Sequence, residues 1–126
     1  MTIAKSKTVK ILSISGSSLL LIMALLHGSG LVYVSSAIAE SNAEDFLKDI
    51  VPVLFAHPSI HLIGLAAFGI LTLFLSHEGK KVLWLLAVPV IIDAALAFYL
   101  GGIVPGILLT IAALCFFCAG FVKKQV

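Results

Sequence analysis

The chain has 126 residues, of which 61% are hydrophobic and only 11% are charged, and its mean hydropathy is +1.22. A soluble domain of this length needs far less apolar sequence for its core, so the composition indicates a membrane protein. The net charge of +2 comes from eight basic and six acidic residues, and every basic residue is a lysine. The lysines form no stripe, which argues against nucleic-acid binding, and the missing arginine argues against a dedicated phosphate site.

Four apolar stretches are long enough to cross a hydrocarbon core of about 30 Å, which takes about 20 helical residues. They cover residues 9–39, 58–76, 82–100 and 103–122. No internal repeat or low-complexity segment divides the chain. We therefore predict an all-α integral membrane protein, in which residues 1–126 form a single domain folded as an antiparallel four-helix transmembrane bundle.

Lysines at the ends of the apolar stretches predict the orientation. They precede the first span, separate the second from the third and follow the fourth, at Lys5, Lys7, Lys10, Lys80, Lys81, Lys123 and Lys124. Because cytoplasmic loops are enriched in positive residues, both termini are predicted to be cytoplasmic, in a bacterial cytoplasmic membrane. The first apolar run ends in an A-x-A sequence at Ala37-Ile38-Ala39, but it is far longer than a signal-peptide core of about 7–15 residues. We expect a retained helix.

The first loop has a helical pattern of its own. Apolar side chains recur at helical spacing opposite acidic residues and one lysine, at Phe46, Leu47, Ile50, Leu54 and Phe55. Ser41 and Glu44 have the spacing of a capping box. The pattern predicts a short amphipathic helix at about residues 42–55, lying on the outer membrane surface, which Pro52 should kink. Pro58 is then expected at the first position of the second span.

His27 and Asp93 are the two ionisable residues that lie clearly inside apolar stretches. Such residues cost roughly 2.5–3.5 kcal/mol on insertion scales, so each needs a partner or a purpose. Tyr33-Val34 is predicted to mark the outer membrane level on the first span and Leu100 on the third, so His27 and Asp93 each stand about seven residues, or roughly 10 Å, below the same level. We expect His27 to face Asp93, and we expect Gly28 and Gly30 to let a neighbouring helix approach His27 closely. Such a pair serves either as a structural lock or as part of a site.

Three further polar residues complete the candidate ligand site. Thr110 in the fourth span falls at a similar depth, although its hydroxyl is also expected to bond to its own helix. His57 and His61 lie four residues apart on one face at the start of the second span, with Gly64 one turn below to admit a close neighbour. The predicted ligand-binding set is therefore His27, His61, Asp93, Thr110 and His57.

Three functions are compatible with this pattern. The first is a binding module or accessory subunit that holds a membrane lipid or an apolar small molecule by its polar head, alone, as a homo-oligomer or in a larger complex. The second is a redox module that binds haem b or a quinone through His27 and His61. The third is a membrane enzyme or proton-coupled transporter in which His27, His61 and Asp93 carry protons or bind a transition metal. No known enzyme motif is present, and an isolated pair of cysteines at Cys115 and Cys118 is a weak redox signal.

Overall fold

The computed structural model of the chain describes residues 2–75 and 78–123, and the side chains from residue 7 onward. This part of the chain is all-helical and contains no strand, in agreement with the predicted class. Its elements are α1 (Thr2–Ser29), α2 (Leu31–Ala39), α3 (Asp45–Leu71), α4 (Gly79–Tyr99) and α5 (Ile103–Val122). α5 has the bounds predicted from the sequence, and α4 begins three residues earlier and ends one residue earlier than predicted.

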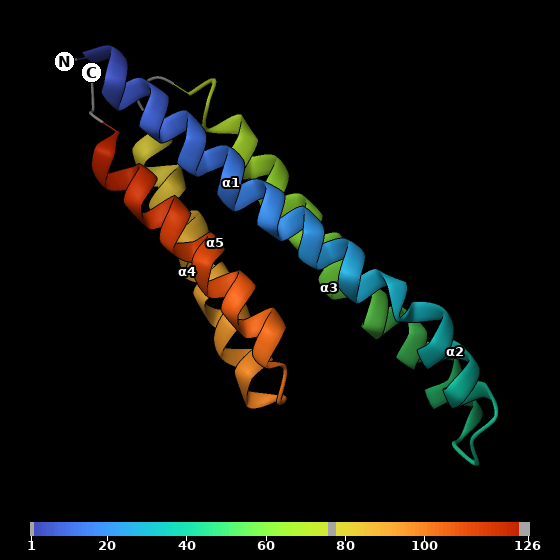
Figure 1. Cartoon of the computed structure of the whole chain (residues 1–126). Helices are drawn as coiled ribbons and strands as arrows, with labels where there is room; N and C mark the ends of the chain where they lie inside the picture. The colour runs from blue at the N-terminus through green and yellow to red at the C-terminus, as the bar shows by residue number, and fades with distance from the viewer. Residues whose placement is uncertain (1, 76–77, 124–126) are drawn as a thin grey trace.

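Among the described residues, four helical segments are long and apolar enough to cross a membrane, in agreement with the four spans predicted from the sequence. They are Lys7–Ala39, Asp45–Leu71, Gly79–Tyr99 and Ile103–Val122. α4 and α5, with 21 and 20 residues, each span about 30 Å at the helical rise of 1.5 Å per residue, which matches the hydrocarbon core. The segment Lys7–Ala39 and helix α3, with 33 and 27 residues, are each longer than α4 or α5. Both extend beyond the turn between α4 and α5 (Figure 1).

α3 begins at Asp45, before the predicted start of the second span at Pro58, and ends at Leu71, before the predicted end at residue 76. Residues 45–55, predicted as a separate loop helix, continue without a break into the second span, and both Pro52 and Pro58 lie inside α3. The helix boundary predicted at Pro58 is therefore wrong. Proline is tolerated inside membrane helices where neighbouring helices bond the freed carbonyl groups, and α3 has α1 and α2 along its length. The predicted place of residues 45–55 on the outer membrane surface stays a prediction.

The predicted capping box is also absent. Helix α3 begins at Asp45 with no side-chain hydrogen bond at its N-cap. The Ser41 hydroxyl instead donates to the carbonyl of Ile38 at the end of α2, at 2.7 Å, and accepts from the backbone N–H of Ala43, at 3.2 Å. Ser41 thus closes the preceding helix, and the helix start at Asp45 lies three residues after the predicted one.

The helices pack as two hairpins that meet through α1 and α5. α1 lies along α3, α4 lies along α5, and α1 also lies along α5, whereas α3 and α4 meet only locally (Figure 1). The beginning of α1 and the end of α5 lie at one end of the bundle, which we call the terminal end (Figure 1). The opposite end holds α2 and the α4–α5 turn, and we call it the loop end. We call the corresponding parts of the bundle the terminal half and the loop half.

Glycine and Phe116 dominate the packing of the terminal half. The Phe116 ring is fully buried and fills the space left by Gly16 of α1 and Gly69 of α3. A side chain at position 69 would run into both the Ser17 hydroxyl and this ring. Small residues at the crossing of α1, α3 and α5 therefore let the three backbones approach closely, as is usual for membrane helices.

Lys123 closes the terminal end. Its ammonium donates to the carbonyls of Thr72 and Leu75, each at 2.7 Å, just beyond the end of α3. The side chain passes over Gly79, where any other residue would collide with it. Partial burial lowers the pKa of the Lys123 ammonium from its usual range. The contact joins the end of α5 to the end of α3, so the two hairpins are tied together at this end.

Candidate functional site

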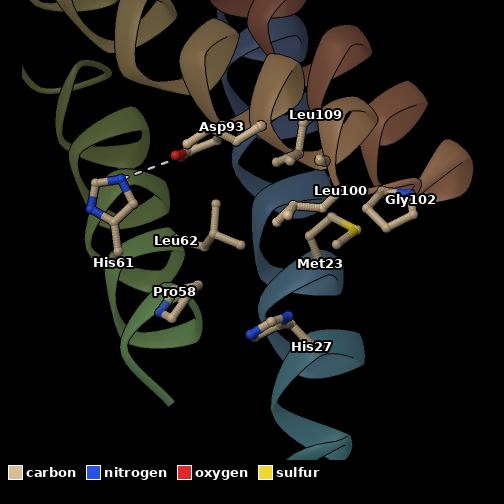
Figure 2. A pocket seen from close by; sticks show the side chains of 12 residues that line it. Met23, His27, Pro58, His61, Leu62, Asp93, Leu100, Gly102 and Leu109 are labelled. Carbon is tan, nitrogen blue, oxygen red and sulfur yellow. Dashed lines mark ion pairs between the residues drawn. The ribbon is translucent and has the colours of Figure 1, made fainter. Parts of the chain in front are cut away.

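A cavity of about 340 Å³ lies in the loop half between the two hairpins. Its volume falls within the range of about 300–1,000 Å³ that is typical of small-molecule sites. All four spanning segments contribute to its wall, as Figure 2 shows. The lining residues are Met23, His27, Pro58, His61, Leu62, Asp93, Leu96, Ala97, Leu100, Gly102, Pro105 and Leu109. The wall is thus mainly apolar and carries three ionisable side chains.

His61 of α3 and Asp93 of α4 form a histidine–carboxylate pair at one side of this cavity. His61 Nε2 lies 3.3 Å from Asp93 Oδ2, with the two side chains 39% and 25% exposed. Asp93 Oδ2 is shielded from the surroundings and has no hydrogen-bond partner among the described residues. Because α3 and α4 meet only locally, this pair is a principal polar link between the two hairpins in the loop half (Figure 2).

His27 has a different partner from the one that the sequence predicted. Its Nε2 lies 2.9 Å from the backbone carbonyl of Phe55 in α3, and its ring stacks on the Phe55 ring at 4.4 Å between centroids. A carbonyl oxygen only accepts, so Nε2 carries the proton. Phe55 follows Leu54, whose carbonyl loses its helical donor to Pro58. His27 therefore bonds the α3 backbone next to the position where proline interrupts its hydrogen bonding.

The glycines beside His27 confirm part of the prediction. A side chain at Gly28 would press against the Ser59 hydroxyl, and one at Gly30 would press against the Phe55 ring. Both glycines therefore allow the close approach of α3 to the α1–α2 junction. Gly64 does not act in this way, because nothing lies within 4 Å of the position its side chain would take.

The predicted contact between His27 and Asp93 is not made. Figure 2 shows His27 farther toward the loop end than Asp93, with Met23 and Leu62 between them. The depth comparison placed Tyr33 and Leu100 at one level, but the helical path of α1 and α2 continues to Ala39, beyond the α4–α5 turn. The two hairpins therefore differ in length, and residues at equal distance from their ends do not meet.

Two of the predicted site residues lie outside the cavity wall. The Thr110 side chain is exposed, and its hydroxyl donates to the carbonyl of Gly106 at 2.7 Å, which is the bond to its own helix that the sequence also predicted. His57 is exposed on α3, and its ring stacks near that of His61 at 6.4 Å between centroids. The structure therefore brings together His61 and Asp93, places His27 at the other side of the same cavity, and leaves Thr110 and His57 out.

The predicted metal triad is not assembled. Among the described residues, no three His, Cys, Asp or Glu side chains are grouped closely enough to hold a metal ion. His27 and His61 both direct Nε2 at protein oxygens. Axial ligation of a haem through these nitrogens would require both contacts to break. The donor geometry thus gives the haem and metal alternatives no support beyond the presence of the histidines.

Several cavity residues were missed because their sequence signal is weak. Met23, Leu62 and Leu109 are apolar residues in apolar helices, and nothing in their spacing separates a cavity wall from a packed core or a lipid-facing surface. The sequence does mark Pro105 and Gly102, because a proline and a glycine at a helix start leave little side-chain volume there. Phe55 was placed on the predicted amphipathic face, but its contact with His27 depends on the unbroken course of α3.

No protein-family model, no curated protein and no solved structure matches this chain.

Proposed function

We propose that the protein is a membrane-embedded binding module that holds an apolar molecule, or a membrane lipid, by its polar head in the cavity between the hairpins. The observation that carries this proposal is a cavity of about 340 Å³ with apolar walls and a histidine–carboxylate pair at one side. Sites for small molecules combine an apolar wall with a few polar groups that fix the orientation of the ligand. The proposed site residues are His27, His61 and Asp93.

The proposal places the protein as an antiparallel four-helix bundle in a bacterial cytoplasmic membrane, with the terminal end on the cytoplasmic side. The lysine-rich ends of the spans support this orientation. Trp84 and Lys80, whose side chains pair at 5.0 Å near the terminal end, match the aromatic and basic residues typical of an interface. The cavity then opens toward the outer leaflet, and residues 45–55 of α3 lie beyond the α4–α5 turn on the outer side.

The limited contact between α3 and α4 supports entry of the ligand from the lipid. These two helices form the side of the bundle that packing does not close, and they carry His61 and Asp93. A molecule that moves laterally out of the outer leaflet meets this pair with its head while its apolar part enters between Leu62 and Leu96. The route requires no aqueous path through the bundle.

Filling the cavity tests the proposed function. Ala97 lines the cavity, whereas Ala95, two residues earlier on α4, is exposed and is not part of its wall. We expect Ala97→Phe to remove a co-purifying apolar molecule that the unaltered protein and Ala95→Phe both retain. Native mass spectrometry of the detergent-solubilised proteins, followed by solvent extraction, measures the bound mass directly. The same bound species in Ala97→Phe, or none in the unaltered protein, would overturn the proposal.

A further inference from the structure

We infer that the head of the bound molecule is a hydrogen-bond donor, a hydroxyl or an amine, and that anionic heads such as phosphate and carboxylate are rejected. This inference rests on the proposed function and names the class of ligand for the same cavity. It follows from the kind of polar group that the wall offers, and from the charges that the wall does not contain.

The Asp93 carboxylate is a hydrogen-bond acceptor that lacks a donor among the described residues. Its Oδ2 is shielded from the surroundings and has no hydrogen-bond partner among the described residues, although His61 Nε2 stands 3.3 Å away. An ionised carboxylate only accepts hydrogen bonds. A buried acceptor without a donor costs about 1–3 kcal/mol, and more when it is charged. The Asp93 side chain lines the cavity and is 25% exposed, so a ligand O–H or N–H donates to the exposed part of this carboxylate.

The two histidines offer acceptors as well. Since His27 Nε2 carries its proton toward the Phe55 carbonyl, the other ring nitrogen of neutral His27 only accepts. Neutral His61 has a single ring proton, and with that proton on Nε2, 3.3 Å from Asp93 Oδ2, its other ring nitrogen likewise only accepts. In this state no lining side chain has a proton left to offer a ligand, so a head that only accepts hydrogen bonds finds no side-chain partner in the wall.

Charge excludes an anionic head. No lysine lines the cavity, and Lys123 is held by the carbonyls of Thr72 and Leu75 at the terminal end. A phosphate or carboxylate beside Asp93 would place two like charges in a medium of low dielectric constant, where repulsion is only weakly screened. The Asp93 carboxylate therefore selects for a neutral or cationic head.

Four probes with the same alkyl chain test the inference: decanol, decylamine, methyl decyl ether and decanesulfonate. Each is added to the whole protein in phosphatidylcholine nanodiscs, and the unfolding temperature is measured. A ligand that binds only the folded state raises this temperature. We expect decanol and decylamine to raise it by a few degrees, and the ether and the sulfonate to leave it unchanged. The ether controls for effects of the alkyl chain on the bilayer.

Two variants assign the effect to the cavity and to its carboxylate. Ala97→Phe should abolish the shifts from decanol and decylamine, and Asp93→Leu should remove the difference between decanol and the ether. If Asp93→Leu does not fold, Asp93→Asn, which keeps the shape and loses one acceptor oxygen, should at least reduce that difference. Equal shifts from decanol and the ether, or a larger shift from the sulfonate, would overturn the inference and leave the binding function standing. No shift from any probe would overturn the binding function itself.

Discussion

The terminal half and the loop half of the bundle are held together by different contacts. In the terminal half, the Phe116 ring fills the space beside Gly16 and Gly69, and Lys123 joins α5 to α3. In the loop half, the hairpins leave a cavity, and His61 and Asp93 link them across it. α2, at the far end of this half, has no buried residue at all.

This difference follows from how helices associate in lipid. Lipid chains are as apolar as leucine, so burial of apolar area contributes little, and close packing holds membrane helices together. The terminal half is closely packed and is expected to supply most of the stability. The loop half is packed less closely because it contains the cavity, and its polar contacts link helices that have few other contacts. A rigid end and an adaptable end are therefore expected in one bundle.

The largest effect is expected from Phe116→Ala in the terminal half. Phe116 is 0% exposed, whereas the next residue, Phe117, is 43% exposed. Phenylalanine-to-alanine changes in packed cores cost about 3–5 kcal/mol through lost contacts and the cavity left behind. We expect about 3 kcal/mol for Phe116→Ala and less than half of that for Phe117→Ala, because lipid fills the space left on the surface. Reversible unfolding in mixed micelles measures both. Equal losses would contradict the assignment of the core.

The glycines of α3 provide a second matched pair. Gly69→Ala places a methyl group against the Ser17 hydroxyl and the Phe116 ring, whereas Gly64 has open space around it. Overpacking typically costs about 1–3 kcal/mol, so Gly69→Ala should lower the free energy of unfolding by about 2 kcal/mol. Gly64→Ala should instead raise it by up to about 1 kcal/mol through helix propensity. The same unfolding assay decides, and a loss at position 64 would mean that a partner covers that face.

The polar link of the loop half is tested by a double-mutant cycle. The His61 Nε2 to Asp93 Oδ2 distance of 3.3 Å predicts that Leu substitutions at the two positions are not additive. Polar pairs between membrane helices couple by about 0.6 kcal/mol on average and by about 1.7 kcal/mol at most, so we expect about 1 kcal/mol here. The pair His27 and Asp93 should be additive within about 0.5 kcal/mol. Coupling of Asp93 to His27 in place of His61 would show that the depth comparison from the sequence was right.

The sequence predicts most of the fold because the spans carry strong local signals. α5 has its predicted bounds, from the glycine pair before Ile103 to the lysine pair after Val122. α3 was divided wrongly, because the helix-breaking tendency of Pro58 is visible in the sequence while the neighbouring helices that compensate for it are not. Local pattern therefore predicts that a helix exists better than it predicts where it starts.

The candidate site was predicted in part. The free-energy cost of an ionisable side chain inside the membrane is enough to single out His27 and Asp93 in the sequence, and both line the cavity. The partner of each was missed, since it depends on the relative length and tilt of two hairpins and not on spacing along one helix. The apolar wall of the cavity carried no signal, because lipid-facing, core and cavity-lining leucines look alike in the sequence.

The smallest effect on global stability, and the most local one, is expected from His27→Leu. The change removes the 2.9 Å bond to the Phe55 carbonyl but keeps an apolar side chain against the Phe55 ring. A hydrogen bond contributes about 0.5–1.5 kcal/mol net, and this one lies in the loosely packed half, so the free energy of unfolding should fall by about 0.5 kcal/mol. Local opening of α3 around Phe55 should increase much more, because the Phe55 carbonyl loses its bond to His27 next to the Leu54 carbonyl, which Pro58 already leaves without a helical donor. Hydrogen exchange followed by mass spectrometry should therefore show faster exchange in residues 45–60 with no change in residues 110–120. Faster exchange throughout the chain would mean that His27 supports the whole bundle, and unchanged exchange in residues 45–60 would mean that its bond to Phe55 contributes nothing.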